Sequence, residues 1–381
     1  METHKGVSRR EFLKLSGMST AAIALMFIGL PRLGQQEAKA AERAAAPVAE
    51  IPVIWIQAGT CTGCSVSVLN TLSPRIQNVL VDEVVPGNHI SLHYHATVMA
   101  AAGDLAIEAI RDTAKNKGGY VLVVEGAIAT KENGIYCEFG EVNGKGITAL
   151  EWTTNLARDA MAVIALGTCA AYGGIPAANP NPTGCEPLKK ILTDHGIGTP
   201  LINVPGCPPH PDWFVGTVAT ILIGGLGSVQ VDEHLRPLAF YKGLIHDNCP
   251  RRGHFDAGRF ARKLSDPYCL YELGCKGPVT HADCPIRLWN SGTEWCIGAN
   301  APCIGCCEPG FPDTVSPFRK QEPIYGVTPP AWVAPMEAEG KGFNPGVAAA
   351  IGVVAGAAAV GGLVAGSKLL GKEKTEKQKE D

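Results

Sequence analysis

Fourteen cysteines, most of them in short groups, constrain this chain more than any other feature of its sequence. A dense later set begins at Cys249, and an early set comprises Cys61, Cys64, Cys169 and Cys207. Disulfide frameworks are typical of small secreted domains, whereas a chain of 381 residues more often uses this many cysteines as metal ligands. The 45 glycines and 28 prolines indicate loops that wrap a bound group.

Composition excludes some partners. The formal charge is −3 and charged residues make up 18% of the chain, so neither a nucleic-acid-binding surface nor an acidic tail is indicated. The length allows two domains with a substantial core.

Four near-continuous apolar runs predict parallel strands buried on both faces. Helical patterns intervene, for example over Val98–Lys115 and Leu150–Met161. This alternation predicts an α/β fold in which residues 50–236 form a flavodoxin-like, doubly wound parallel-sheet domain. The predicted strands are Val53–Ile56, Val121–Val124, Ala162–Leu166 and Leu201–Val204.

Cysteines follow three of these strands at their carboxyl ends. Ligand sites in open α/β sheets form there, so Cys61, Cys64, Cys169 and Cys207 can converge, although they lie far apart in the sequence. Four thiolates suit tetrahedral zinc or a [4Fe–4S] cluster. A thioredoxin-type redox pair is the competing interpretation for the Cys-x-x-Cys alone. Glu125 ends another strand. Its side chain is a candidate proton-path residue, a partner contact or a plain loop carboxylate.

Residues 237–320 lose this alternation and are predicted to be a largely irregular cysteine-rich domain. A segment with so little hydrophobic periodicity cannot build a large core. Metal binding would therefore contribute to its folding free energy directly. One imidazole and three thiolates form a first group: His246, Cys249, Cys269 and Cys275. His246 alone could be a surface histidine, but its three-residue step to Cys249 favours a ligand. Four thiolates form a second group: Cys284, Cys296, Cys303 and Cys306.

Both termini carry targeting signals. Residues 1–40 contain Arg9-Arg10, an apolar run and a small-x-small cleavage pattern, the order found in twin-arginine export signals. Residues 346–367 carry no charge and as a helix would span roughly 30 Å, so we expect a transmembrane anchor after a linker at 321–345. The lysine-rich tail 368–381 would lie in the cytoplasm. The globular body would then lie on the periplasmic side of the inner membrane, in contact with membrane lipid.

Six motifs resemble those of the small subunit of [NiFe] hydrogenases, in one order and over most of the chain from Ile51 to Pro317. Both terminal segments are similar to the membrane-bound uptake type, and Trp295-Cys296 is similar to the selenium-containing branch. The motifs are Cys61-Thr-Gly-Cys64, Gly-Thr-Cys169-Ala-Ala-Tyr-Gly-Gly, Pro-Gly-Cys207-Pro-Pro, His246-x-x-Cys249-x-Arg-Arg, Leu-Gly-Cys275-Lys-Gly-Pro and Pro-Cys303-Ile-Gly-Cys306.

The resemblance implies an electron-transfer subunit without catalytic residues of its own. A large subunit would split hydrogen (H2 = 2 H+ + 2 e−) at a nickel–iron site. Electrons would pass through three iron–sulfur clusters to a membrane cytochrome b, another quinone-linked integral subunit, or a periplasmic cytochrome c. A proximal [4Fe–4S] cluster would be held by Cys61, Cys64, Cys169 and Cys207 (the proximal set). A distal [4Fe–4S] cluster would be held by His246, Cys249, Cys269 and Cys275 (the distal set).

The medial cluster is where this chain departs from the commonest family pattern. Many members have proline after the tryptophan matching Trp295 and hold [3Fe–4S] with three cysteines. Cys296 stands there in this chain, so we predict a medial [4Fe–4S] cluster held by Cys284, Cys296, Cys303 and Cys306 (the medial set). If Cys296 is a packed thiol instead, the cluster is [3Fe–4S].

Two other interpretations remain open on the sequence alone. The related subunit of a quinone-reducing respiratory complex shares the proximal arrangement but lacks the second cysteine-rich half. An exported zinc-binding structural protein would be colourless.

The oxygen-tolerant branch of the hydrogenases carries extra cysteines at positions matching Gly63 and Gly174, so oxygen tolerance is not expected. The sequence leaves open whether the partner contains selenocysteine, the direction of the reaction, and the roles of Cys137, Cys185 and Cys307, which we expect to be packed thiols.

Overall fold

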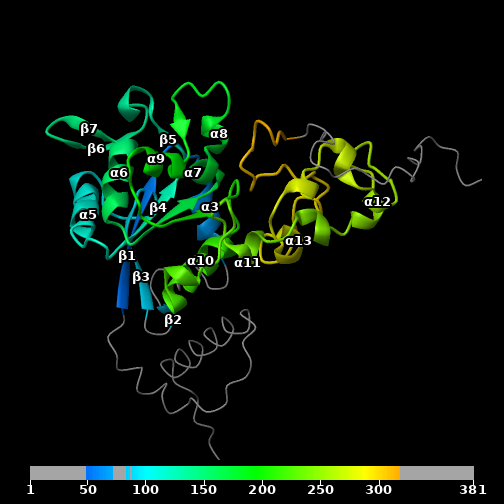
Figure 1. Ribbon diagram of the computed structural model, residues 1–381, viewed down its shortest axis with the longest axis horizontal. Coiled ribbons are helices and arrows are strands. Elements are labelled where there is room, and N and C mark those ends of the chain that lie inside the picture. The colour runs from blue at the N-terminus through cyan, green and yellow to red at the C-terminus, as the bar shows by residue number, and fades with distance from the viewer. Residues whose placement is uncertain (1–48, 72–82, 86–87, 318–381) are drawn as a thin grey trace, which may run out of the picture. The chain divides into compact units, whose positions relative to one another are not determined.

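A six-stranded sheet organises the first half of the chain (Figure 1). The computed structural model describes residues 49–71, 83–85 and 88–317, which all fall within one compact unit. The strands are β1 Ala49–Gln57, β2 Glu83–Val85, β3 Asn88–His95, β4 Val121–Glu125, β8 Ala162–Leu166 and β10 Leu201–Val204. They stand in the order β10-β8-β4-β1-β3-β2, and only the pairing of β2 is antiparallel. The five parallel strands therefore have the 2-1-3-4-5 order of flavodoxin-like sheets.

The predicted strands are confirmed as β1, β4, β8 and β10, and the last two have the predicted ends. The strand β3 was not predicted, because its Asn-His-Ile-Ser-Leu-His-Tyr-His sequence alternates polar and apolar residues. It lies beside the edge strand β2, and a strand near the edge of a sheet requires fewer buried apolar side chains than a central strand.

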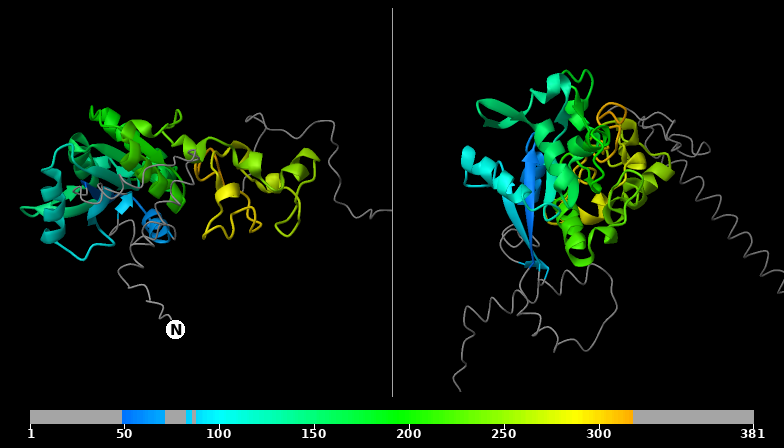
Figure 2. Two further views of the ribbon diagram at one scale, coloured as in Figure 1. Left: turned by 90° about the horizontal axis from the view of Figure 1, so that it is seen from below. Right: turned by 60° about the vertical axis from the view of Figure 1, so that its left-hand side comes forward.

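Side chains from the central strands alternate between two cores. Ile164 and Leu166 face one core and Val163 and Ala165 the other, so β8 is buried on both faces. The second core packs against α5 Asp104–Ala114, α6 Ala149–Asp159 and α9 Leu188–Asp194. The first packs against α3 Gly63–Leu69 and α10 Pro211–Gly224. Two views show this layering of helices about the sheet (Figure 2).

Local signals explain several element ends. The Thr148 side chain accepts a hydrogen bond from the backbone N–H of Glu151 at 3.1 Å and so caps α6. Asn143 and Gly144, both with positive φ, form the turn of a hairpin made of β6 Glu138–Val142 and β7 Lys145–Thr148. The remaining elements of this half are β5 Ile128–Ala129, η1 Lys131–Gly134, α7 Thr168–Tyr172, α8 Gly174–Ala177, β9 Cys185–Glu186 and η2 Leu226–Ser228.

Within residues 237–317, the second half contains only short helical turns joined by loops, as predicted. Its elements are α11 Leu238–Tyr241, η3 Ile245–Asn248, α12 Arg252–Asp256, η4 Leu270–Leu273, η5 Gly277–Val279 and α13 Cys284–Arg287. Several of its cysteines lie in the apolar core that also covers the first face of the sheet. The two halves therefore share one core.

Buried polar side chains fasten the second half to the first. The indole N–H of Trp213 donates to Asp283 at 2.7 Å, and the hydroxyl of Tyr241 donates to the carbonyl of Pro205 at 2.7 Å. His210 accepts from the backbone N–H of Asp212 through Nδ1, so its Nε2 carries the proton and donates to the carbonyl of Leu288.

Among residues 49–71, 83–85 and 88–317, no helix has the length and apolar character needed to cross a bilayer. The predicted signal peptide, anchor and basic tail lie outside the described residues.

Ile164→Ala should lower the free energy of unfolding by about 2–5 kcal/mol, because Ile164 is fully buried in β8 and its loss leaves a cavity. Urea denaturation followed by tryptophan fluorescence would measure this. Ile223→Ala is the control, since Ile223 is 55% exposed and should change stability by less than about 0.5 kcal/mol. Equal midpoints for the two variants would contradict the assigned core.

Candidate functional site

The structure brings the four thiols of the proximal set together at the carboxyl edge of the sheet. Cys61 and Cys64 follow β1, Cys169 follows β8 and Cys207 follows β10. Burial raises the pKa of Cys64 well above its usual range, and Glu125 and the other three cysteines each raise it further. Thiols that act on one another in this way are close neighbours.

This position is the topological switch point of the sheet. The strand order reverses between β1 and β4, and ligand sites in open α/β sheets form at such a point. Backbone hydrogen bonds join the loops, with Gly59 donating to the carbonyl of Ala127 at 2.9 Å.

Glycines make room for these sulfur atoms. Gly167 has φ +87°, and a Cβ there would overlap the sulfur of Cys64. A Cβ on Gly63 or Gly174 would lie 3.1 Å from the sulfur of Cys61 or Cys169 respectively. The positions at which the oxygen-tolerant branch carries cysteine therefore adjoin two thiols of the proximal set.

The chemistry of these thiols fits a cationic group. Burial, as the largest cause, raises the pKa of Cys169 to about 11 and that of Cys207 to about 12. Without a cation these thiols keep their protons at neutral pH. A metal centre that binds the thiolates displaces those protons and balances the charge that would otherwise be buried.

Glu125 is a fully buried carboxylate beside the proximal set. Its Oε1 accepts from the hydroxyl of Thr60 at 3.1 Å and from the backbone N–H of Ser65 at 3.3 Å. Its Oε2 accepts from the indole N–H of Trp55 at 3.1 Å and from the hydroxyl of Ser65. Glu125 is therefore a fully bonded structural carboxylate whose charge acts on Cys64.

His95 extends this network. Its Nδ1 accepts from the backbone N–H of Thr97 at 3.2 Å, so Nε2 carries the proton and donates to the hydroxyl of Ser65 at 3.1 Å. Burial is the main cause that lowers the pKa of His95 and keeps its ring neutral. Neither His95 nor Ser65 was singled out from the sequence, because neither belongs to a metal-ligand pattern.

The distal set lines one small pocket. All four of its residues contribute to the wall: His246, Cys249, Cys269 and Cys275. The Nε2 atom of His246 is buried and has no hydrogen-bond partner. Burial lowers the pKa of His246, so its ring is neutral and can offer this nitrogen to a metal. An unpartnered buried nitrogen in a pocket of thiols suits a ligand role.

Cys306 is the common neighbour of the other three thiols in the medial set. Burial raises the pKa values of Cys284, Cys296 and Cys303, and the charge of Cys306 raises each of these pKa values further. Cys296, although exposed, also acts on Cys284, so it lies within this set.

The three sets are arranged in series. Burial and Cys169 raise the pKa of Cys207, and Cys306 of the medial set raises it further, so these residues are near neighbours. The hydroxyl of Thr168, next to Cys169, donates to the carbonyl of Cys306. At the other end, the backbone N–H of Lys276, next to Cys275 of the distal set, donates to the carbonyl of Cys303 at 2.7 Å. The medial set thus touches both neighbours.

Three cysteines remain outside these sets. Cys185 is buried and Cys137 is half-buried, and both pack with Ala127 and Ala129 as small apolar residues. Cys307 is also buried but is not a remote packed thiol, because its sulfur lies 3.9 Å from that of Cys306. Among the described residues, no three Cys, His, Asp or Glu side chains are placed to hold a single metal ion.

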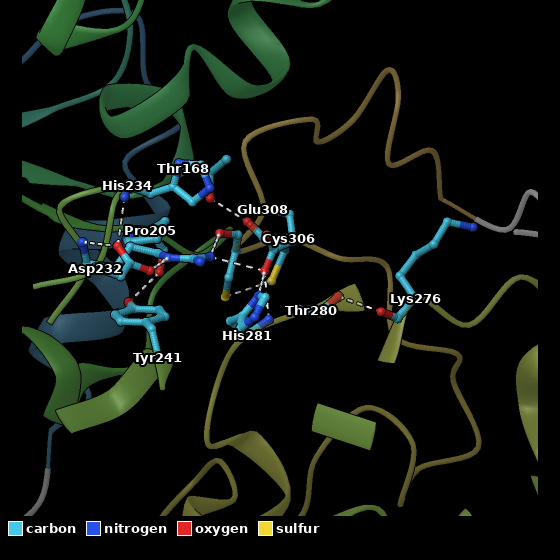
Figure 3. A network of polar contacts seen from close by, with 12 residues as sticks. Thr168, Pro205, Asp232, His234, Tyr241, Lys276, Thr280, His281, Cys306 and Glu308 are labelled. Carbon is cyan, nitrogen blue, oxygen red and sulfur yellow. Dashed lines mark hydrogen bonds and ion pairs between the residues drawn. The ribbon is translucent and has the colours of Figure 1, made fainter. Parts of the chain in front are cut away.

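A buried ion-pair network lies beside the medial set and was not predicted from the sequence (Figure 3). Arg236 is 2% exposed and donates to Asp232 at 2.7 Å and to Glu308 at 3.1 Å. Glu308 also accepts from the backbone N–H of His281 at 2.6 Å. An arginine in a loop carries no local sequence signal when a partner such as Glu308 comes from far along the chain.

Known proteins match both halves of the chain. Residues 241–319 match the family described as the C-terminal part of the NiFe/NiFeSe hydrogenase small subunit. Residues 61–221 match the family described as NADH ubiquinone oxidoreductase, 20 Kd subunit. The first match covers the cysteine-rich half, which the respiratory-complex alternative lacks.

Whole proteins extend these matches. The periplasmic [NiFeSe] hydrogenase small subunit of Desulfomicrobium baculatum is 44% identical over 83% of this chain and 99% of its own length. The quinone-reactive Ni/Fe-hydrogenase small chain of Wolinella succinogenes is 41% identical over 93% of this chain and 96% of its own length. Among solved structures, the recombinant [NiFeSe] hydrogenase of Desulfovibrio vulgaris Hildenborough aligns with a TM-score of 0.68 and 46% identity, covering 71% of this chain and 98% of that chain.

Glu125→Gln should lower the free energy of unfolding by about 1–3 kcal/mol, because one fixed donor is left unpaired in either orientation of the amide. If the amide NH2 of the introduced glutamine takes the Oε1 position, it faces the backbone N–H of Ser65, which is also a donor. If the NH2 takes the Oε2 position, it faces the indole N–H of Trp55, again a donor. Chemical denaturation measures the change. Glu141→Gln, on the exposed hairpin strand β6, is the matched control, and equal stability of the two variants would refute the argument.

Proposed function

This chain belongs to the small-subunit family of nickel–iron hydrogenases and is the electron-transfer subunit of such a heterodimer, and we propose that it holds three iron–sulfur clusters in series. The observation that carries the proposal is a pair of hydrogen bonds: Thr168, next to Cys169, donates to the carbonyl of Cys306, and Lys276, next to Cys275, donates to the carbonyl of Cys303. These contacts support a medial set between the proximal and distal sets, as a chain of one-electron carriers requires.

The proximal and distal sets would each hold a [4Fe–4S] cluster. Four thiols at one edge of the sheet support the first assignment. The unpartnered Nε2 of His246, in the pocket that it shares with Cys249, Cys269 and Cys275, supports the second. Replacing a thiolate by a neutral imidazole removes one negative charge, which should raise the potential at the distal end.

The medial set would hold a third [4Fe–4S] cluster with Cys296 as its fourth ligand. Cys296 acts on Cys284, and Cys306 acts on Cys296, so this thiol lies where a fourth ligand is needed. The alternative is [3Fe–4S] on Cys284, Cys303 and Cys306, with Cys296 as a thiol beside the cluster.

Bound iron–sulfur clusters would supply one-electron redox chemistry, tuned by charge, hydrogen bonds and exposure. The chain's own residues determine that tuning. The backbone N–H of Gly277 donates to the sulfur of Cys275 at 3.4 Å. Such hydrogen bonds stabilise the more negative, reduced form of a cluster. The negative charge of Glu125 beside Cys64 acts in the opposite direction at the proximal set.

Hydrogen activation would take place entirely in the large subunit, with no catalytic residue supplied by this chain. The exposed Cys61 and the exposed Val66 and Ile175, which flank the proximal set in sequence, are suited to the interface with that subunit. Glycines at positions 63 and 174 leave the proximal cluster with four cysteine ligands, so sustained activity in air is not expected.

The domain plan and location follow the same proposal. A signal at 1–40 would export the folded subunit, and 50–236 and 237–320 would hold the proximal cluster and the other two clusters. The linker 321–345, anchor 346–367 and tail 368–381 would fix it to the periplasmic side of the inner membrane. Relatives named periplasmic and quinone-reactive support this location and a quinone-linked membrane acceptor, with a periplasmic cytochrome c as the alternative.

The purified heterodimer should contain about twelve iron atoms in its small subunit and absorb broadly in the visible. Cys296→Pro should remove about one of them and produce the paramagnetic signal of oxidised [3Fe–4S], because proline offers no ligating atom. Iron analysis and electron paramagnetic resonance of anaerobically prepared enzyme measure both effects.

Cys307→Ser is the matched control for this substitution, since Cys307 adjoins the same cluster but is not assigned as a ligand. A strong three-iron signal in fresh wild-type enzyme would reject Cys296 as a ligand. A colourless protein containing zinc would reject the function itself.

Deleting residues 346–381 should release an active, soluble heterodimer and abolish electron delivery to quinone while preserving reduction of a soluble dye. Membrane fractionation and the two activity assays measure this. Active enzyme that stays on washed membranes after the deletion would exclude the anchor.

A further inference from the structure

The segment 306–308, which carries the medial ligand Cys306, is fastened to the first half of the chain at each of its residues. The carbonyl of Cys306 accepts from the hydroxyl of Thr168. The carbonyl of Cys307 accepts from Arg236 at 3.3 Å, and the side chain of Glu308 forms an ion pair with Arg236 at 3.1 Å. Figure 3 shows Thr168 reaching this segment from the sheet side.

Thr168 also ties the two proximal loops to each other. Its backbone N–H donates to the carbonyl of Gly206 at 3.0 Å, and its Oγ1 accepts from the backbone N–H of Gly206 at 2.9 Å. Thr168 precedes the proximal ligand Cys169, and Gly206 precedes the proximal ligand Cys207. One hydroxyl, on a residue that is 1% exposed, therefore accepts from one proximal loop and donates to the medial segment.

The same junction links two ligands of different sets. The Thr168 hydroxyl accepts from the backbone N–H of Gly206, which precedes Cys207, and donates to the carbonyl of Cys306, so the spacing of these two ligands depends on how firmly segment 306–308 is held. Electron transfer between redox centres falls steeply with their separation. A loosened junction would slow transfer without removing any ligand.

On the proposed three-cluster function, we propose that Thr168 is a positioning residue that sets the electron-transfer junction between the proximal and medial clusters. Its hydroxyl holds the loop of Cys207 and the segment of Cys306 at a fixed spacing. Arg236 secures the far side of the same segment through Asp232 and Glu308.

The test compares Thr168→Val, which keeps the shape and removes the hydroxyl, with Thr168→Ser, which keeps the hydroxyl. Two rates are measured on each holoenzyme: hydrogen–deuterium exchange, which needs only the partner's nickel–iron site, and hydrogen-driven reduction of a soluble acceptor, which needs the whole chain of clusters. The ratio of acceptor reduction to exchange should fall roughly tenfold in Thr168→Val, given the cost of small misplacements. It should stay near the wild-type value in Thr168→Ser.

A second readout is spectroscopic. The magnetic interaction between the reduced proximal and medial clusters should weaken in Thr168→Val, while iron content stays at the wild-type level. Thr217→Val is the matched control for a merely structural effect, because Thr217 is equally buried and donates only within its own helix, to the carbonyl of Trp213. It should lower stability without changing the ratio or the magnetic interaction.

A wild-type ratio and unchanged magnetic interaction in iron-replete Thr168→Val would overturn the proposal. If Thr168→Val loses iron, Arg236→Lys decides, since lysine lacks the planar fork with which Arg236 bonds Asp232 through Nε and both Glu308 and the carbonyl of Cys307 through Nη1. A lowered ratio there supports the junction, and a wild-type ratio overturns it. Wild-type enzyme without iron–sulfur absorption would instead be a failure of the proposed function.

Discussion

Burying sulfur ligands in a shared apolar core is the constraint on which the rest of this structure depends. Thiols at the carboxyl edge of the sheet have their pKa values raised mainly by burial, to about 11 for Cys169 and about 12 for Cys207. They can be thiolates only if a cationic centre replaces their protons. The fold provides the enclosure, through strands covered on both faces and glycine at Gly167, where any side chain would collide with Cys64. Folding and cluster binding therefore support each other.

A parallel sheet solves the problem of gathering ligands from distant segments. Because β1, β8 and β10 run in one direction, their following loops meet at one edge regardless of separation along the chain. The second half has no such scaffold and consists of short turns. It gains order by packing its cysteines into the core of the first half and by polar ties such as Trp213 to Asp283.

The buried charged side chains of this core are paired or hydrogen-bonded. Arg236 is placed between Asp232 and Glu308, so no ion of this group is left without a counter-charge. Glu125 is satisfied by donors from Thr60, Ser65 and Trp55. Both groups lie beside the thiols of the ligand sets, where fixed charges and hydrogen bonds set the electron affinity of a bound centre. The contacts that stabilise the carboxylate and the guanidinium would also tune the potential of a bound cluster.

The sequence by itself determined four of the sheet strands, because β8 and β10 read as continuous apolar runs. Cysteine grouping and the family resemblance together predicted the residues of the three ligand sets. The sequence missed β3, whose alternating pattern reflects its place near the sheet edge. Only the tertiary structure decided that Cys207 adjoins Cys306 and that Cys303 adjoins Cys275. It alone revealed Thr168, His95, Arg236 and Cys307 as neighbours of the ligand sets. Spacing indicates only local ligand groups such as Cys61 and Cys64, whereas Cys169 and Cys207 reach the same site through the parallel sheet. The order of the groups, and the hydroxyl or guanidinium that joins them, depends on contacts between segments with no sequence relation to each other.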